Sequence, residues 1–206
     1  MRVVFCLAAC VCVLAVALIC AFLFANGLPF FGKVSALDFL LGEKWKPTND
    51  IYGILPMILG SLYITAGAVL FGAPIAVLTS VYMAYFAPKP VLRVLEPAVS
   101  LLAGIPSVIY GLFGLTLLVP FVRETFGGKG FSILTASLLL GMMILPTIIN
   151  VAVSSLRQVP MNYYEGSLAL GATAERSVFR VMLPAASSGV TSGIVLGVGR
   201  AIGETT

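Results

Sequence analysis

The sequence contains no histidine and few charged residues. Only 10% of its 206 residues are charged, whereas a soluble domain carries about 25%. Without histidine the chain lacks the commonest general base and the commonest transition-metal ligand, which disfavours acid–base and metal catalysis. With 60% apolar residues and a mean hydropathy of +1.09, it has too few polar side chains to cover a water-soluble globule. We therefore expect an integral membrane protein without a cofactor or a metal site.

The cysteines and the basic residues give no sign of a soluble partner. Four cysteines fall within the first apolar stretch, where a thiol behaves as a small hydrophobic group: Cys6, Cys10, Cys12 and Cys20. The net charge of +4 would suggest nucleic acid in a soluble protein, but the Lys and Arg residues are scattered singly. We predict no nucleic-acid partner and expect the lipid bilayer to surround most of the surface.

Five charge-free runs are each long enough to cross a bilayer. They are residues 3–32, 51–88, 97–122, 130–156 and 181–199. A helix needs about 20 apolar residues to cross the hydrocarbon, and lipid tolerates only helices or closed barrels. Barrel strands would alternate in polarity, and these runs do not. We therefore predict an all-α, polytopic helical bundle of about five transmembrane helices.

The first two runs frame an outer segment. Residues 1–32 are far longer than the roughly 7–15 apolar residues of a signal peptide, so we predict a retained N-terminal anchor. An inside N-terminus leaves Lys and Arg nearly balanced between the two sides, so the positive-inside rule decides little. Residues 33–52 then form a periplasmic loop with a short amphipathic helix capped by Ser35 and ended by Gly42, and Trp45 suits the headgroup level. The second run is too long for one straight span, and we expect a bend at Pro56.

A polar segment between the fourth and fifth runs, residues 157–184, holds a specific spacing. Glu165-Gly166-Ser167 is followed by three residues, Gly171, nine residues and a Val-Met-Leu-Pro sequence that ends in Leu183 and Pro184. This register resembles the EAA loop of ABC-importer permeases, which reads E-A-A, three residues, G, nine residues and I-x-L-P. The residues themselves predict a helix over 162–170, a turn at Gly171, and a second helix that begins at a Thr173 cap with Glu175 in its first turn.

The resemblance implies that this loop docks into a cleft of an ATPase subunit. Glu165 would offer its carboxylate to a basic residue there, and Gly166, Ser167, Gly171, Leu183 and Pro184 would complete the coupling segment. Gly166 and Ser167 replace the Ala-Ala pair of the pattern. The replacement keeps both residues small but lowers helix propensity by roughly 0.5–1 kcal/mol per residue. The alternative is an ordinary solvated loop.

Small residues dominate the last apolar run. Gly189, Gly193 and Gly197 recur every four residues, and Gly199 and Gly203 repeat the spacing, which is typical of closely packed membrane helices. Arg200 and Glu204 are four residues apart and so share a helix face. A charge inside a bilayer is costly and normally faces a partner, a cavity or a substrate path.

Arginine suits an oxyanion because its planar guanidinium stays charged and can hold two oxygens at once. We therefore predict that Arg200 faces an anion pathway and that Glu204 holds its orientation when the substrate is absent. The alternative is that Arg200, roughly 24 Å along the helix from Pro184, reaches the membrane surface by snorkelling.

Several segments together resemble one family. They are FLLGEKWKPTNDIYGILPMILGSLYIT (39–65), LLAGIPSVIYGLFGL (101–115), ILPTI (144–148), SLRQVP (155–160), EGSLALGAT (165–173) and GRAIGET (199–205). They resemble the PstC-type permeases, one of two membrane subunits of bacterial phosphate ABC importers. The resemblance implies a type I ABC-importer permease fold, a single permease domain over 1–206 with its core at about 53–206, and a multi-pass location in the bacterial inner membrane. The family continues into a sixth span, so the ending at Thr206 predicts a fragment or a shortened gene.

The same resemblance implies a function and partners. The function is phosphate import by alternating access, and the partners are two ATP-binding cassette subunits, a second, PstA-like permease and a periplasmic phosphate-binding protein. The chain has no G-x-x-x-x-G-K-S/T loop, so ATP hydrolysis is expected on the separate subunit and the chain is not itself an enzyme. The alternatives are the sister PstA-type subunit, a sulfate or molybdate permease, a self-contained channel or secondary carrier, and an inactive truncated subunit.

Overall fold

A computed structural model of the chain describes residues 1–32 and 34–204. The chain forms two compact units, Met1–Leu59 and Gly60–Thr206. The predicted division into an anchor, an outer loop and a permease core stays a prediction.

The first unit begins with one long apolar helix, α1 (Arg2–Phe31). Its 30 residues are long and apolar enough to cross a membrane, and all of them lie on the surface of the unit or are only partly covered. The four cysteines lie exposed on this helix with free thiols. An all-apolar surface on an isolated helix is the surface expected for a helix that lipid surrounds.

A small module follows α1. It contains α2 (Ala36–Leu41) and a hairpin formed by β1 (Trp45–Lys46), the turn η1 (Pro47–Asn49) and β2 (Ile51–Tyr52). The predicted helix lies between Ser35 and Gly42 as expected, although within the described residues the Ser35 side chain makes no capping hydrogen bond. The hairpin was not predicted. Asp50 closes its turn with a φ of 54°, a left-handed conformation that Asp tolerates.

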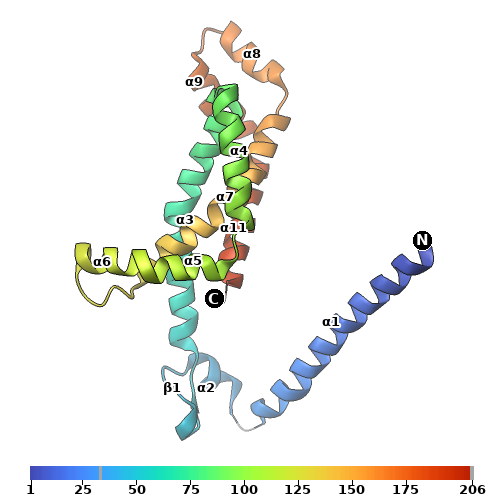
Figure 1. The fold of residues 1–206 in the computed structure, drawn as a ribbon, viewed down its shortest axis with the longest axis vertical. Helices are drawn as coiled ribbons and strands as arrows, with labels where there is room; N and C mark the ends of the chain where they lie inside the picture. Colours follow the sequence, from blue (N-terminus) through green and yellow to red (C-terminus); the bar gives the residue numbers. More distant parts are fainter. Residues whose placement is uncertain (33, 205–206) are drawn as a thin grey trace. The chain divides into compact units, whose positions relative to one another are not determined.

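The second unit is a helical bundle with α7 at its centre. Its elements are α3 (Leu55–Val81, which begins in the first unit), η2 (Tyr82–Phe86), α4 (Lys89–Gly104), α5 (Ser107–Phe113), η3 (Gly114–Leu118), α6 (Val119–Phe126), α7 (Ile133–Gln158), α8 (Met161–Ala169), α9 (Ala174–Ser177), η4 (Val178–Met182), α10 (Leu183–Ala185) and α11 (Ser187–Gly203). Figure 1 shows α3, α4 and α11 running along α7, while α5 and α6 cross their direction. Helices α8 and α9 lie at one end of the bundle (Figure 1).

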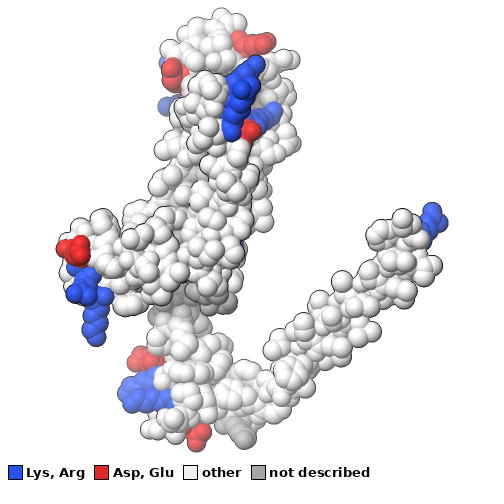
Figure 2. Space-filling view, in the orientation of Figure 1, with Lys and Arg blue, Asp and Glu red and all other residues white. Residues whose placement is uncertain are grey.

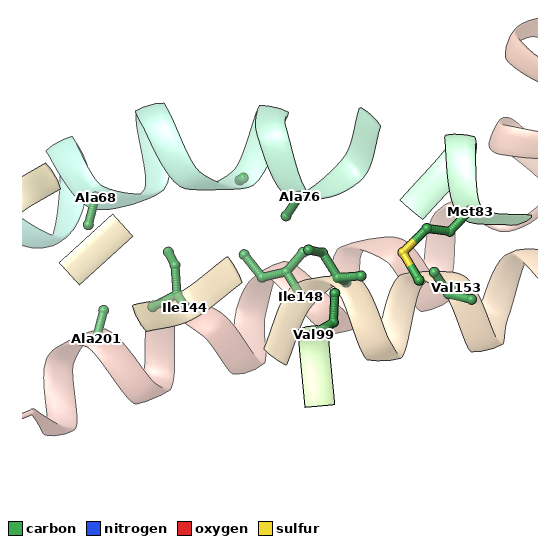
Figure 3. Close-up of a cluster of buried hydrophobic side chains, with 10 residues drawn as sticks. Ala68, Ala76, Met83, Val99, Ile144, Ile148, Val153 and Ala201 are labelled. Atoms are coloured by element: carbon green, nitrogen blue, oxygen red, sulfur yellow. The ribbon is translucent and has the colours of Figure 1, made fainter. Parts of the chain in front are cut away.

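Buried side chains of α7 hold these helices together. Ile144 and Ile148 are fully buried, and they pack with alanines of α3 and α11 and with Val99 of α4 (Figure 3). Alanine at these positions lets the helix backbones approach closely. The core is therefore built from large α7 side chains set against small residues of its neighbours.

The glycines of α11 confirm only part of the predicted packing pattern. A Cβ atom at Gly193 would lie 3.2 Å from Val151 Cβ, and one at Gly197 would lie 2.8 Å from Ile148 Cγ1. A Cβ atom at Gly189 would likewise overlap the side chain of Ser155. The absence of a side chain at these three glycines therefore allows α11 to lie against α7. A Cβ atom at Gly199 or Gly203 would meet no described atom within 4 Å, so their repeat of the spacing does not belong to this interface.

Among the described residues, four helices are long and apolar enough to span a membrane, or five if one bent pair counts as one span. The prediction of a single helix over 97–122 is wrong, because α4 ends at Gly104 and a new helix begins at Ser107. Pro106 has no amide hydrogen and disfavours helical backbone at Ile105, which explains the break. The predicted bend at Pro56 is also wrong: Pro56 lies in the first turn of α3, where its missing N–H is not needed.

Three π turns interrupt the helices, and each ends two residues before a proline. The turns η2, η3 and η4 precede Pro88, Pro120 and Pro184, respectively. In each case the residue just before the proline donates its amide hydrogen five residues back, as Ala87 does to Tyr82 O at 2.8 Å. Proline cannot make the normal helical bond to the carbonyl four residues back, and the wider turn accommodates the shift in register.

Candidate functional site

The predicted coupling segment, residues 157–184, is called the coupling loop; it folds as a helix, a tight turn and a second helix. Helix α8 ends at Ala169 with Leu170 as its C-cap, and Gly171 follows with a φ of +84°. Gly171 N donates to Leu168 O at 2.9 Å and Ala172 N donates to Ser167 O at 3.2 Å. These two bonds and the left-handed glycine form a Schellman motif, which ends a helix and satisfies its last carbonyls. The structure therefore confirms the predicted helix and the glycine turn, with α8 displaced by one residue from the predicted range.

The second helix of the coupling loop is capped as predicted. Thr173 Oγ1 accepts a hydrogen bond from Arg176 N at 3.3 Å, and Glu175 lies in the first turn of α9. Ser177 is completely buried, and its Oγ lies 2.9 Å from Ser167 Oγ and 2.9 Å from Thr173 O. Ser167 therefore links α8 to α9, a contact that the alanine of the resembled pattern could not make.

The outer face of α8 is exposed. Glu165 and Gly166 are both exposed, and a Cβ atom at Gly166 would meet no described atom within 4 Å. Large apolar side chains lie nearby with much of their surface uncovered: Leu170 is 91% exposed and Tyr163 57%. Figure 2 shows charged side chains gathered at this end of the second unit, above a largely uncharged bundle surface. An exposed apolar patch with charges at its edge is typical of a protein–protein contact site.

Leu183 and Pro184 connect the coupling loop to α11. Leu183 is half-buried and packs on a buried cluster that includes Leu156 and Val178, whereas Pro184 is exposed. The helices Ala174–Ala185 and Ser187–Gly203 meet at an angle of 70°. Pro184 follows the π turn η4, so the chain that leaves the coupling loop is bent just before it enters α11.

Two contacts at the base of the coupling loop could not be predicted from the sequence. Tyr85 donates its hydroxyl hydrogen to Leu156 O at 2.7 Å, which satisfies a carbonyl in the last turn of α7. Arg157 Nη2 lies 2.8 Å from Glu96 Oε1 and forms an ion pair with α4. The partners are 71 and 61 residues apart in the sequence, and no local pattern could reveal them.

Arg200 and Glu204 lie together at the end of α11. Arg200 is half-buried, and its Nη1 donates to Thr147 Oγ1 of α7 at 3.1 Å. Helix α11 ends at Gly203, so Glu204 is the residue that caps it rather than part of a continuing helix. Glu204 lines a cavity of about 230 Å³, together with Thr65 and Ser107. The structure thus places both predicted pathway residues at the end of α11, with the Arg200 guanidinium bonded to Thr147 of α7.

Comparison with known proteins identifies the family. Residues 76–206 match the family described as "Binding-protein-dependent transport system inner membrane component". The chain is 40% identical to the probable ABC transporter permease protein YqgH of Bacillus subtilis (strain 168), over 89% of this chain and 61% of that protein.

Two phosphate transport system permease proteins PstC are also similar. The one from Haemophilus influenzae is 37% identical, over 82% of this chain and 60% of that protein, and the one from Mesorhizobium japonicum is 33% identical, over 85% and 62%. The chain thus spans about three fifths of the length of these relatives. The helical bundle with its coupling loop and the family match lead to one conclusion: the chain belongs to the inner-membrane components of binding-protein-dependent transport systems, as a multi-pass membrane protein with PstC-type relatives.

Proposed function

We propose that this chain is a membrane permease subunit of an ATP-driven importer that carries inorganic phosphate into the cell by alternating access. The observation that carries the proposal is the exposed coupling loop, whose Gly166 is left open by the chain's own fold. No packing contact of the described residues requires a glycine at position 166, so its small size leaves room for the surface of a partner. The two PstC relatives are phosphate permeases by name, which supports phosphate over sulfate or molybdate.

The proposed partner of the coupling loop is the ATP-binding cassette subunit, present in two copies. Glu165 offers an exposed carboxylate to a basic residue of the ATPase, and Leu170 and Tyr163 supply apolar contact area. ATP hydrolysis takes place on that separate subunit, so this chain acts as a transport subunit. A second, PstA-like permease completes the membrane pathway, and a periplasmic binding protein delivers phosphate.

The link between Ser167 and Ser177 lets the coupling loop move as one body. Closure of the ATPase dimer shifts this body, and the shift reaches α11 through Leu183, Pro184 and the 70° bend. Packed helices transmit such a displacement because they switch between discrete arrangements. Nucleotide therefore changes which side of the membrane the pathway faces by shifting the population of two states.

Arg200 is the proposed anion-binding residue of the pathway. It is half-buried at the end of α11, where Thr147 fixes one side of its guanidinium. The remaining N–H groups can hold two oxygens of an oxyanion in parallel. Glu204, four residues further on and just beyond α11, holds the arginine in place when the anion is absent.

The experiment is uptake of labelled phosphate by the complete complex reconstituted in vesicles. We expect uptake that requires ATP and that unlabelled phosphate suppresses far better than sulfate does. Uptake without the ATPase subunits would instead support a self-contained carrier, and suppression by sulfate alone would assign a different oxyanion.

A pair of loop variants tests the docking step. Gly171→Leu places a side chain at a left-handed residue and should abolish co-purification with the ATPase. Gly166→Ala is the matched control, since its Cβ has open space and alanine favours helix. The proposal fails if both variants bind the ATPase equally well.

A further inference from the structure

The chain breaks its helical structure between α4 and α5. Helix α4 ends at Gly104, and α5 begins at Ser107. Ile105 N donates to Leu102 O over a long 3.4 Å, and Pro106 has no amide hydrogen to give. The last carbonyls of α4 therefore need other donors, because no water is present in the hydrocarbon to replace them.

Tyr110 supplies one of these donors. Its hydroxyl donates to Leu102 O at 3.0 Å, from one turn inside α5 back to the last turn of α4. The side chain is only 8% exposed, so the bond is shielded from solvent. Residues 105–106 form the break. The Tyr110–Leu102 hydrogen bond crosses this break and fixes the angle between α4 and α5.

The break lies beside the proposed anion pathway. Val99 of α4 and Ala201 of α11 belong to the same buried cluster, formed around Ile144 and Ile148 of α7 (Figure 3). Ala201, the residue after Arg200, also lines the same cavity as Ser107, the first residue of α5 beyond the break.

Another part of α5 faces the same cavity as the second proposed pathway residue, Glu204. Ser107 and Gly111 line the cavity that Glu204 also lines. Helix α5 and the end of α11 therefore face one cavity, with Ser107 and Gly111 on one side and Ala201 and Glu204 on the other.

We propose that Tyr110 is a positioning residue of the anion pathway: its hydrogen bond to Leu102 O sets the angle at the break and so determines where α5 lies at the cavity that Glu204 lines at the end of α11. This inference rests on the proposed import function. Without the hydroxyl, Leu102 O loses its well-placed donor and α5 can take other positions. ATP hydrolysis then continues, but fewer turnovers move an anion.

The test compares transport with hydrolysis in the reconstituted complex. Tyr110→Phe keeps the ring and removes only the hydroxyl. We expect the number of phosphate ions moved per ATP hydrolysed to fall about fivefold, the population change that follows from losing one hydrogen bond. A purely structural role would lower the amount of complex and leave this ratio unchanged.

Ser137→Ala is the matched control. Ser137 Oγ donates to Ile64 O at 3.1 Å, so the variant also removes a hydroxyl-to-carbonyl bond between helices, but away from the break. Its ratio should equal that of the wild type. The inference is overturned if Tyr110→Phe keeps the wild-type ratio, or if Ser137→Ala lowers it equally.

A second measurement does not depend on phosphate import. Gly104→Cys introduces a thiol where a Cβ meets no described atom within 4 Å, in a chain whose four cysteines are changed to serine. Its labelling by a charged maleimide should become about fivefold faster when Tyr110→Phe is added. If the wild-type complex moves no phosphate, the proposed function fails, and the labelling rate alone then decides whether Tyr110 holds the break: an unchanged rate overturns that role.

Discussion

Ser177 Oγ lies 2.9 Å from Ser167 Oγ, and this partly buried contact joins the two helices of the coupling loop. Ser167 stands where the resembled pattern has alanine, so the link is an addition to that pattern. Gly166 beside it weakens α8, because glycine costs about 1 kcal/mol relative to alanine inside a helix. The serine pair ties the weakened helix to α9 and so offsets part of that cost.

We predict that Ser167→Ala lowers the stability of the complex by no more than about 1 kcal/mol, the usual net value of one hydrogen bond. The cost stays small because Ser177 keeps its bond to Thr173 O. Binding of the ATPase should persist, since alanine fits the resembled pattern. Thermal unfolding and co-purification measure the two effects, with Ser192→Ala, which loses an exposed bond to Ser188 O, as the control. Complete loss of ATPase binding would contradict this prediction.

Replacement of Arg200 should impair transport more strongly as more of its charge and hydrogen-bonding groups are lost. Arg200→Ala should reduce ATP-dependent phosphate uptake by about 10- to 100-fold, since hydrogen bonds to charged groups contribute about 1.5–3 kcal/mol. Uptake by Arg200→Lys should lie between that of the wild type and that of Arg200→Ala, because an ammonium keeps the charge without the planar guanidinium. Thr147→Val, which removes only the hydroxyl that holds the guanidinium, should have the smallest effect. Normal uptake by an assembled Arg200→Ala complex would remove Arg200 from the pathway.

The glycines of α11 should differ sharply in their tolerance of a methyl group. Gly197→Ala would bring a Cβ to 2.8 Å from Ile148 Cγ1. We expect it to destabilise the bundle by about 1–3 kcal/mol through overpacking. Gly199→Ala is the matched control, because its Cβ would meet no described atom within 4 Å. Thermal unfolding of the purified protein should separate the two variants, and equal melting temperatures would contradict the packing derived from the structure.

Trp45, the single tryptophan of the chain, reports on the small module between α1 and α3. Its ring contacts that of Tyr52 at 5.8 Å, and Tyr52 in turn contacts Phe30 at the end of α1. Aromatic rings concentrate at the membrane–water interface. We therefore expect lipids brominated near the headgroup to quench Trp45 fluorescence. Quenching by aqueous iodide alone would place the ring in water instead. Tyr52→Ala tests whether the contact between the two rings holds Trp45 at this depth.

Local signals explain why the coupling loop could be predicted. Gly171 is glycine because the turn needs a positive φ, and Thr173 caps the next helix with its own side chain. Both effects act over a few residues, and spacing alone reveals them. The same holds for the glycine repeat from Gly189 to Gly197, which follows one face of one helix.

The remaining features depend on contacts that are distant in the sequence or on the placement of prolines. The run 97–122 is free of charge throughout, so hydropathy gave no sign that Pro106 divides it. The ion pair between Arg157 and Glu96 and the bond from Tyr85 to Leu156 O depend on how helices pack. Gly199 and Gly203 repeat the four-residue spacing but do not lie in the interface between α11 and α7. Periodicity alone could not distinguish them from the glycines that do.

The most direct test of the account is cross-linking from the exposed position 165 on α8 in intact cells. Glu165→Cys should form a cross-link to the ATPase subunit and should react with charged maleimides only from the cytosolic side. Thr48→Cys, in the turn of the hairpin, is the control and should react only from the outside. Labelling of position 165 from outside the cell, or the absence of a cross-link to a nucleotide-hydrolysing protein, would contradict the importer assignment.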